Sequence, residues 1–320
     1  MTTRPVARSA TPDTAPAASD LGASDLHDST LPPELLAQIR RIEIRARRLA
    51  STLLAGDFRS IFRGSGIEFA EAREYVPGDD IRLIDWNVTA RMGTPWVKHY
   101  VEERETNVVS VVDLSASQLA AQPRAGRLGV AAEVCALLSF AAAYNNDRTG
   151  LLTFSDRVEQ FVPPARGTRH VLRLVRDVLF HPQPHAATDL SAATEYLARI
   201  LKRRSIVFIL SDFFDEGYEQ SLRSLARRHD VVALTLVDPL DLALPNAGLV
   251  EMADAESGTR MLVDTSDASV RRRYERAAED RAARRRATLT AAGVDEVELR
   301  LDEDHTAPLL RYFRRRAALR

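Results

Sequence analysis

The sequence has little of the chemistry that several protein classes require. It contains a single cysteine, Cys135, which excludes an internal disulfide bond. Cys135 lies in the apolar stretch 130–140, where we expect a small buried hydrophobic residue rather than a nucleophile. The seven histidines show no His-Glu-x-x-His spacing, and His181 and His185 fall in a stretch broken by proline. Zinc chemistry is therefore not expected.

Net charge and long apolar runs are missing as well. The 44 Lys and Arg residues nearly cancel the 45 Asp and Glu residues, so the overall charge gives no reason to expect nucleic acid or an acidic membrane as the main partner. No window approaches the roughly 18 apolar residues of a membrane span, and the N-terminus lacks the apolar core of a signal peptide. The 45% of apolar residues suffice for a sizeable core. We therefore expect a cytoplasmic globular protein.

Composition divides the chain into three parts. Residues 1–30 are rich in Ala, Pro, Ser, Thr and Asp and should be disordered. Residues 31–106 begin with a basic amphipathic helix that ends near Gly56. We expect this helix to dock on the protein with its arginines in solvent, and contact with a membrane surface is the less favoured alternative. Residues 107–320 form the main domain, with an added hairpin at about 241–266.

In the main domain, apolar strands alternate with helices. We expect strands at about 108–112, 149–154, 158–162, 205–210, 231–237 and 296–301. Helices are expected at about 127–144, 169–179, 190–202, 218–228, 268–291 and 305–319. This alternation predicts an α/β fold in which a mostly parallel sheet carries helices on both faces.

Oxygen-bearing side chains follow several of these segments. Asp113, Ser115 and Ser117 come after the first strand, Thr188 precedes the helix at 190, and Asp212 follows the strand 205–210. Each has an ordinary structural explanation as a turn or helix cap. Together they fall at one edge of the inferred sheet, and five oxygen ligands suit Mg²⁺ or Mn²⁺ with one coordination position left open. Nothing in the sequence designates a base for a serine nucleophile.

The order of these five residues resembles the metal-ion-dependent adhesion site of von Willebrand factor A domains. The resemblance covers roughly residues 107–318 and implies a von Willebrand A-like, Rossmann-like sheet. It also implies that the five residues hold a divalent cation and that a partner's carboxylate takes the open position. Gln118 and Ala186-Ala187 depart from the family pattern, although neither departure removes a ligand.

A longer signature precedes this domain. Residues 73–91 read Arg-Glu-Tyr-Val-Pro-Gly-Asp-Asp-Ile-Arg-Leu-Ile-Asp-Trp-Asn-Val-Thr-Ala-Arg, with Gly64-Ser-Gly66 and Glu68-Phe69 upstream and Val97-Lys98 downstream. This pattern is similar to that of the bacterial DUF58 family, whose members carry a von Willebrand A-like domain after it and are often encoded beside MoxR-type AAA+ ATPases. The resemblance implies an assembly or chaperone-like module that acts with such an ATPase.

The same segment also has a direct physical interpretation. Pro77-Gly78-Asp79-Asp80 predicts a turn. Gly64-Ser-Gly66 lacks the pattern of a phosphate-binding loop, so the chain should not be the ATPase itself. The amphipathic and charged side chains of the segment suit either a partner-binding face or an internal ion-pair network; they are Arg73, Tyr75, Asp79, Asp80, Arg82, Asp85, Trp86 and Arg91.

The sequence thus predicts a non-catalytic protein-binding module that depends on Mg²⁺ or Mn²⁺ and engages an acidic side chain of a partner protein. Two alternatives stay open. A magnesium-dependent phosphoryl hydrolase would use Asp113, although Ser115 stands where the common phosphatase pattern has a second aspartate. A metal-free scaffold would use the same oxygens only to cap helices and turns.

Overall fold

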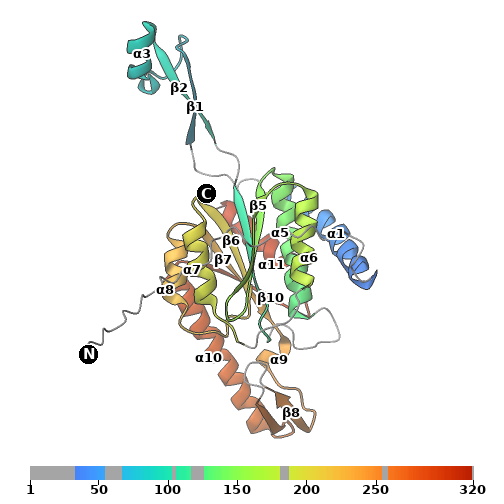
Figure 1. Cartoon of the computed structure of the whole chain (residues 1–320). Coiled ribbons are helices and arrows are strands. Elements are labelled where there is room, and N and C mark those ends of the chain that lie inside the picture. The colour runs from blue at the N-terminus through green and yellow to red at the C-terminus, as the bar shows by residue number, and fades with distance from the viewer. Residues whose placement is uncertain are drawn as a thin grey trace, which may run out of the picture.

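A six-stranded sheet forms the centre of the molecule. The computed structural model describes residues 33–54, 67–102, 106–116, 126–180, 187–253 and 259–318 (Figure 1). The sheet contains β3 (Asn107–Asp113), β4 (Arg148–Phe154), β5 (Val158–Ala165), β6 (Ser205–Ser211), β7 (Asp230–Val237) and β10 (Asp295–Arg300). Their order is β10-β7-β6-β3-β4-β5, and all neighbours are parallel except the edge strand β5. The predicted α/β fold with a mostly parallel sheet is confirmed.

Helices cover both faces of this sheet because successive strand residues point to opposite sides. Val108 and Val112 of β3 lie in a core formed with α1 (Pro33–Leu54), α5 (Arg127–Tyr144), α6 (Thr168–Leu179) and α11 (Thr306–Ala318). Val109 and Val111 lie in a second core, formed with α7 (Leu190–Ile200), α8 (Glu219–Ala226) and α10 (Ala268–Ala292). The central strands are buried on both faces, which explains their nearly continuous apolar sequences.

Helix α5 requires a correction to the sequence-based expectation about membrane spans. By length and composition, α5 is one helix in the described ranges that could cross a membrane, so the expectation that no window reaches that length is wrong. In the structure most of α5 is buried, and it packs against α1 and α6 as a core helix of the domain. Cys135, at its centre, is fully buried as predicted, and this burial raises the pKa of its thiol.

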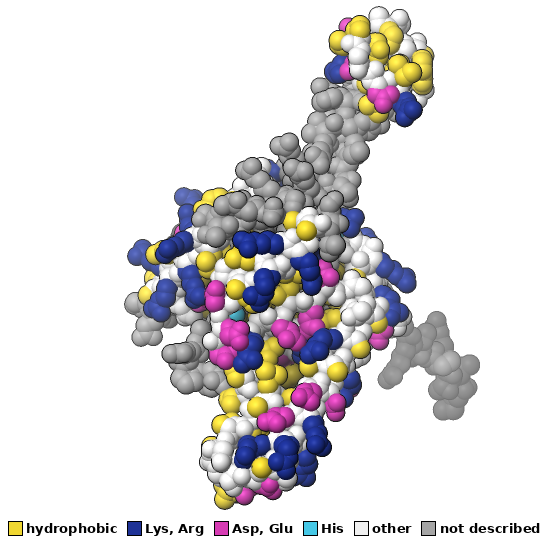
Figure 2. All heavy atoms as spheres, turned by 180° about the vertical axis from the view of Figure 1, so that it is seen from behind, with side chains coloured by type: hydrophobic (Ala, Val, Ile, Leu, Met, Phe, Trp, Pro, Cys, Tyr) yellow, Lys and Arg dark blue, Asp and Glu magenta, His cyan; other side chains and the backbone are white. Residues whose placement is uncertain are grey.

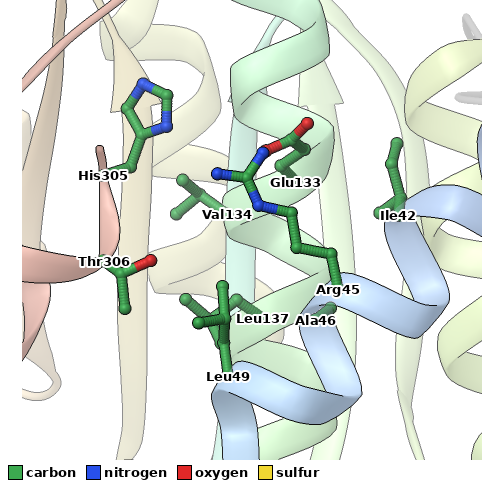
Figure 3. Close-up of a pocket in the computed structure, with 9 residues that line it drawn as sticks. All are labelled: Ile42, Arg45, Ala46, Leu49, Glu133, Val134, Leu137, His305 and Thr306. Carbon is green, nitrogen blue, oxygen red and sulfur yellow. The ribbon is translucent and has the colours of Figure 1, made fainter. Parts of the chain in front are cut away.

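The basic helix α1 docks on α5, as the sequence predicts. Ile42, Ala46 and Ala50 face the core, and the Arg45 guanidinium donates a hydrogen bond to Glu133 of α5 at 3.0 Å. Figure 3 shows Arg45 reaching toward Glu133 beside a small cavity of about 20 Å³. His305 also lines this cavity, and burial lowers the pKa of its imidazole. Such a volume is enough for one water molecule.

Two pieces extend from the sheet at its opposite ends (Figure 1). We call the first the arm: the antiparallel strands β1 (Ile67–Glu74) and β2 (Trp96–Glu102), with the 3₁₀-helix η2 (Ile81–Leu83) and helix α3 (Trp86–Met92) between them. The second follows β7 and contains α9 (Pro239–Leu242) and a hairpin of β8 (Leu249–Ala253) and β9 (Arg260–Asp264). The predicted hairpin is confirmed, whereas the predicted disordered tail lies outside the described residues.

Candidate functional site

The strand order places a switch point between β3 and β6. From β3 the chain continues through β4 and β5 on one side, and it later returns on the other side through β6, β7 and β10. In open α/β sheets the crevice beyond the carboxyl ends of two such strands is where ligands bind. Asp113 is the last residue of β3, and Asp212 directly follows β6. Both predicted acidic ligands therefore lie at this edge.

The Asp113 carboxylate is buried and held in one orientation. Asp113 is only 1% exposed to solvent. Oδ1 accepts a hydrogen bond from the backbone N–H of Ser115 at 2.9 Å, and Oδ2 accepts one from the Ser211 hydroxyl at 2.7 Å. The Ser211 oxygen in turn accepts the backbone N–H of Phe213 at 3.0 Å. Ser211 is thus a positioning residue that sequence reasoning missed, since a serine at a strand end has no distinctive pattern.

Burial makes the charge on Asp113 costly. Desolvation raises the pKa of Asp113 to about 7, and the neighbouring charge of Asp212 adds to the rise. Asp212 is only 3% exposed, and its Oδ1 accepts the backbone N–H of Phe214 at 3.1 Å. Two buried carboxylates that interact in this way favour either a shared proton or a bound cation. Their oxygens, with the nearby hydroxyls, are the donors that a hard divalent cation prefers.

Thr188 lies in a loop that is hydrogen-bonded to the residues following β4 and β6, the two strands that flank β3. The backbone N–H of Asp189 donates to the carbonyl of Ser155, directly after β4, at 2.7 Å. The backbone N–H of Leu190 donates to Asp215 Oδ2, in the loop after β6, at 2.8 Å. These two bonds bring Thr188 to the same edge as Asp113. Neither Ser155 nor Asp215 stood out in the sequence, because both read as ordinary turn residues.

The five predicted ligands therefore have different outcomes. The structure brings Asp113, Ser115 and Asp212 together and places Thr188 at their edge, while Ser117 lies outside the described residues. In the parts of the chain that the structure describes, no group of three or more His, Cys, Asp or Glu side chains is arranged for a metal ion. The predicted site differs from such groups because it combines two carboxylates with hydroxyls.

Arg127 adds a positive charge to this edge. It begins α5, is 8% exposed, and its Nη2 pairs with Asp241 Oδ2 of α9 at 2.5 Å. Burial by itself would lower the pKa of Arg127, but the charges of Asp241, Asp212 and Asp238 raise it. Arg127 therefore offsets part of the negative charge beside Asp212. The sequence carries no signal for this pair, because its members lie 114 positions apart.

Four of the eight predicted partner-binding residues form hydrogen bonds within the arm and stabilise its own structure. The Arg73 guanidinium donates to both oxygens of Asp79, at 2.8 and 2.6 Å. Asp80 caps η2 through the N–H of Arg82, and Asp85 caps α3. The predicted turn is confirmed: the N–H of Asp79 donates to the Val76 carbonyl at 3.0 Å, and Gly78 takes the positive φ of +115° that this turn requires.

The other predicted residues of the arm are more accessible. Trp86 is 70% exposed, Arg82 and Arg91 are exposed, and Tyr75 is half-buried. Sequence reasoning missed the large apolar side chains that are exposed beside them: Val76, Ile81, Leu83 and Met92. The arm therefore separates into an internal network of carboxylates and an outer surface of apolar residues and arginines.

Comparison with known proteins identifies the family. The family model described as "Protein of unknown function DUF58" matches residues 71–284. The chain belongs to the DUF58 family. Its DUF58 relatives include the uncharacterized proteins Rv1480 of Mycobacterium tuberculosis and Mb1516 of Mycobacterium bovis. Each is 34% identical over 292 residues, which cover 90% of this chain and 92% of the relative. The resemblance predicted from residues 73–91 is confirmed.

Solved structures that are similar to this DUF58 protein have low sequence identity. An aerotolerance-related membrane protein from Bacteroides fragilis is 15% identical, with a TM-score of 0.44 over 67% of this chain and all of that chain. BatB from Bacteroides thetaiotaomicron is 16% identical, with a TM-score of 0.42 over the same shares. The SpRpn10 VWA domain is 12% identical, with a TM-score of 0.34 over 65% of this chain and 95% of that chain. These TM-scores are too low for the similarities to support the fold assignment, which rests on the strand order of this chain.

Proposed function

We propose that this DUF58 protein is a non-catalytic protein-binding module that holds Mg²⁺ or Mn²⁺ at the switch point between β3 and β6. The ligands would be Asp113, Ser115, Ser117, Thr188 and Asp212. Bound there, the cation would supply a positive coordination position for an acidic side chain of a partner protein. A MoxR-type AAA+ ATPase is the partner that the family resemblance suggests, and the cytoplasm is the expected location.

One observation carries this proposal: a buried pair of carboxylates at the switch point. Asp113 and Asp212 are 1% and 3% exposed, and the charge of Asp212 adds to the raised pKa of Asp113. A buried charge persists in proteins when it is paired or coordinates a metal. Arg127 supplies part of the compensating charge to Asp212, and its own closest partner is Asp241. A divalent cation would compensate the remainder.

Titration calorimetry with MgCl₂ and MnCl₂ tests the metal site directly. Wild type should bind one ion, whereas Asp113→Ala and Asp212→Asn should show no binding heat. Asp156→Asn is a matched control, because Asp156 is an exposed carboxylate just beyond the end of β4. Equal heats in wild type and Asp113→Ala, or no heat in either, would exclude the metal site.

The partner claim needs a separate measurement, because a AAA+ ATPase itself requires magnesium for its nucleotide. The purified MoxR-type ATPase encoded nearest to this chain should bind the wild type and lose affinity for Asp113→Ala, with nucleotide and magnesium held constant. Asp156→Asn should bind as the wild type does. Equal binding of all three proteins would show that the ATPase does not use the metal site.

A metal-free scaffold has one observation in its favour. Both oxygens of Asp113 already accept hydrogen bonds from the chain, at 2.9 Å from Ser115 and 2.7 Å from Ser211. These bonds explain the position of the side chain without a metal. They do not remove the repulsion from Asp212, which is why we favour the metal-binding module. The scaffold predicts partner binding that is unchanged in Asp113→Asn.

A further inference from the structure

The turn that carries Asp212 contains an unusual backbone conformation. Phe213 has a φ of +57°, and the only other non-glycine residue with a positive φ in the described ranges is Asn146, with a φ of +64°. Asparagine tolerates this left-handed region, whereas a bulky side chain such as phenylalanine adopts it rarely and at a cost. Strain of this kind persists where the surrounding structure enforces it, and it is found most often at functional sites. Phe213 directly follows a predicted metal ligand.

Hydrogen bonds within this turn connect Phe213 to both buried carboxylates. The N–H of Phe213 donates to the Ser211 hydroxyl oxygen at 3.0 Å, and the same hydroxyl donates to Asp113 Oδ2 at 2.7 Å. The N–H of Phe214 donates to Asp212 Oδ1 at 3.1 Å. This last bond closes across Phe213 and therefore depends on the φ of that residue. One turn of four residues thus orients Asp113 and Asp212 together.

The ring of Phe213 explains what enforces this conformation. Many apolar atoms at the far end of the arm face solvent (Figure 2), whereas Phe213 is only 4% exposed. Its ring lies in the second core, with residues of α7, α8 and α10, and it packs at a tilt against Tyr218 with the ring centroids 6.0 Å apart. Rotating the backbone out of the left-handed region would move the ring out of this core. Burial of the ring therefore offsets the backbone strain.

We propose that Phe213 is a positioning residue for the candidate metal site: its buried ring holds the backbone at positive φ, and this backbone presents Asp212 and Ser211 to Asp113. Phe213 would act through these residues and not as a ligand, and its role rests on the proposed metal site. A residue that favours positive φ should therefore preserve the site even without the ring. A residue that avoids positive φ should not.

Two substitutions separate this role from that of an ordinary core residue. Phe213→Ala and Phe213→Gly remove the same ring and leave nearly the same cavity, but only glycine adopts positive φ at no steric cost. Any loss that the two variants share comes from the core. Any difference in metal affinity between them reports the backbone conformation at residue 213, because a purely structural role of the ring would affect both alike.

Titration calorimetry with MgCl₂ on the full chain measures this difference. Phe213→Gly should bind within about threefold of the wild-type affinity, whereas Phe213→Ala should bind at least about tenfold more weakly. Phe213→Asn should resemble the glycine variant, since asparagine tolerates the left-handed region. Tyr218→Leu keeps Phe213 but loosens the packing of its ring, so it should weaken binding by a smaller factor. It tests the same role where removal of the ring prevents folding.

Asn146 provides a matched control for the backbone effect. It also has a positive φ, but it lies between α5 and β4, at the edge of the sheet opposite to Asp113. Asn146→Ala and Asn146→Gly should bind MgCl₂ as the wild type does. Amide hydrogen exchange in EDTA examines the turn without metal: the N–H of Phe214 should exchange at least about tenfold faster in Phe213→Ala than in Phe213→Gly.

The outcomes distinguish this proposal from the metal site on which it rests. Equal magnesium affinity in Phe213→Ala and Phe213→Gly, with binding by the wild type, would overturn the role of Phe213 and leave the metal site standing. Equal exchange of the Phe214 N–H in the two variants would overturn it as well. No magnesium binding by the wild type, with exchange that still differs between the variants, would refute the metal site and leave Phe213 as the residue that orients Asp212.

Discussion

Replacing Asp113 with asparagine should stabilise the metal-free protein, although Asp113 is a fully buried and hydrogen-bonded residue. Asn keeps the size of the side chain and an oxygen that can accept the N–H of Ser115, which lies 2.9 Å from Oδ1 in the wild type. It removes the ionisable group whose pKa burial and Asp212 raise to about 7. The expected gain is therefore electrostatic and depends on pH.

The sign and size of the effect follow from that pKa. The unfolded chain releases the Asp113 proton near its ordinary pKa of 3.8, whereas the folded chain keeps it up to about 7. Between these values the folded state binds more protons, so the free energy of unfolding falls as pH rises. Roughly three pKa units correspond to about 4 kcal/mol, fully lost above pH 7. Asp113→Asn should escape this loss, because asparagine does not titrate.

Urea unfolding in the presence of EDTA measures the difference. At pH 4 the two proteins should differ little, and at pH 8 Asp113→Asn should be the more stable by up to about 4 kcal/mol. Asp156→Asn, which changes an exposed carboxylate beyond β4, should follow the wild type at both pH values. With saturating MgCl₂ only the proteins that retain Asp113 should gain stability. A constant difference between Asp113→Asn and wild type from pH 4 to pH 8 would refute the reasoning.

Three other substitutions have expected outcomes that thermal or urea unfolding can check. Gly150→Ala should cost about 1–3 kcal/mol, because a Cβ there would lie 3.0 Å from the Val162 carbonyl oxygen. Arg285→Ala should cost about 3–5 kcal/mol, because it leaves the largely buried Glu296 without the guanidinium 2.6 Å away. Burial lowers the pKa of His305 from its ordinary 6.5, so the unfolded chain takes up a proton there before the folded chain does and the wild type loses stability as pH falls from 7 to 5. His305→Leu should lose less stability over this range, and equal losses in the two proteins would contradict this reasoning.

The sheet could be predicted from the sequence because its central strands are buried on both faces. Such strands read as unbroken apolar runs, as in β3 and β6, where all residues but Asn107 are buried. The same logic located Asp113 and Asp212, since the residue that ends such a run lies at the sheet edge. Thr188 was placed by its position before α7. Local patterns therefore sufficed for residues whose role depends on where a strand or helix ends.

Contacts between distant segments could not be predicted in this way. The pair of Arg127 and Asp241 joins the first turn of α5 to α9, and neither residue has a pattern that designates the other. Within the arm, the sequence showed a mixture of charged and aromatic residues, but it did not show which of them pair with each other and which remain exposed to solvent. Asp79 lies 2.6 Å from Arg73 because the turn at Gly78 brings them together, whereas Trp86 remains in solvent. Exposure depends on packing that one sequence does not encode locally.

Chain topology explains why the arm and the candidate metal site do not share a surface. The arm precedes β3 and therefore joins the sheet at the amino end of that strand, whereas Asp113 stands at its carboxyl end. Seven strand residues separate the two ends by about 20 Å. A single partner that used both surfaces would have to reach along the whole strand. The hairpin, by contrast, follows β7 through α9 and lies at the same end as Asp113, because Asp241 of α9 is tied to Arg127.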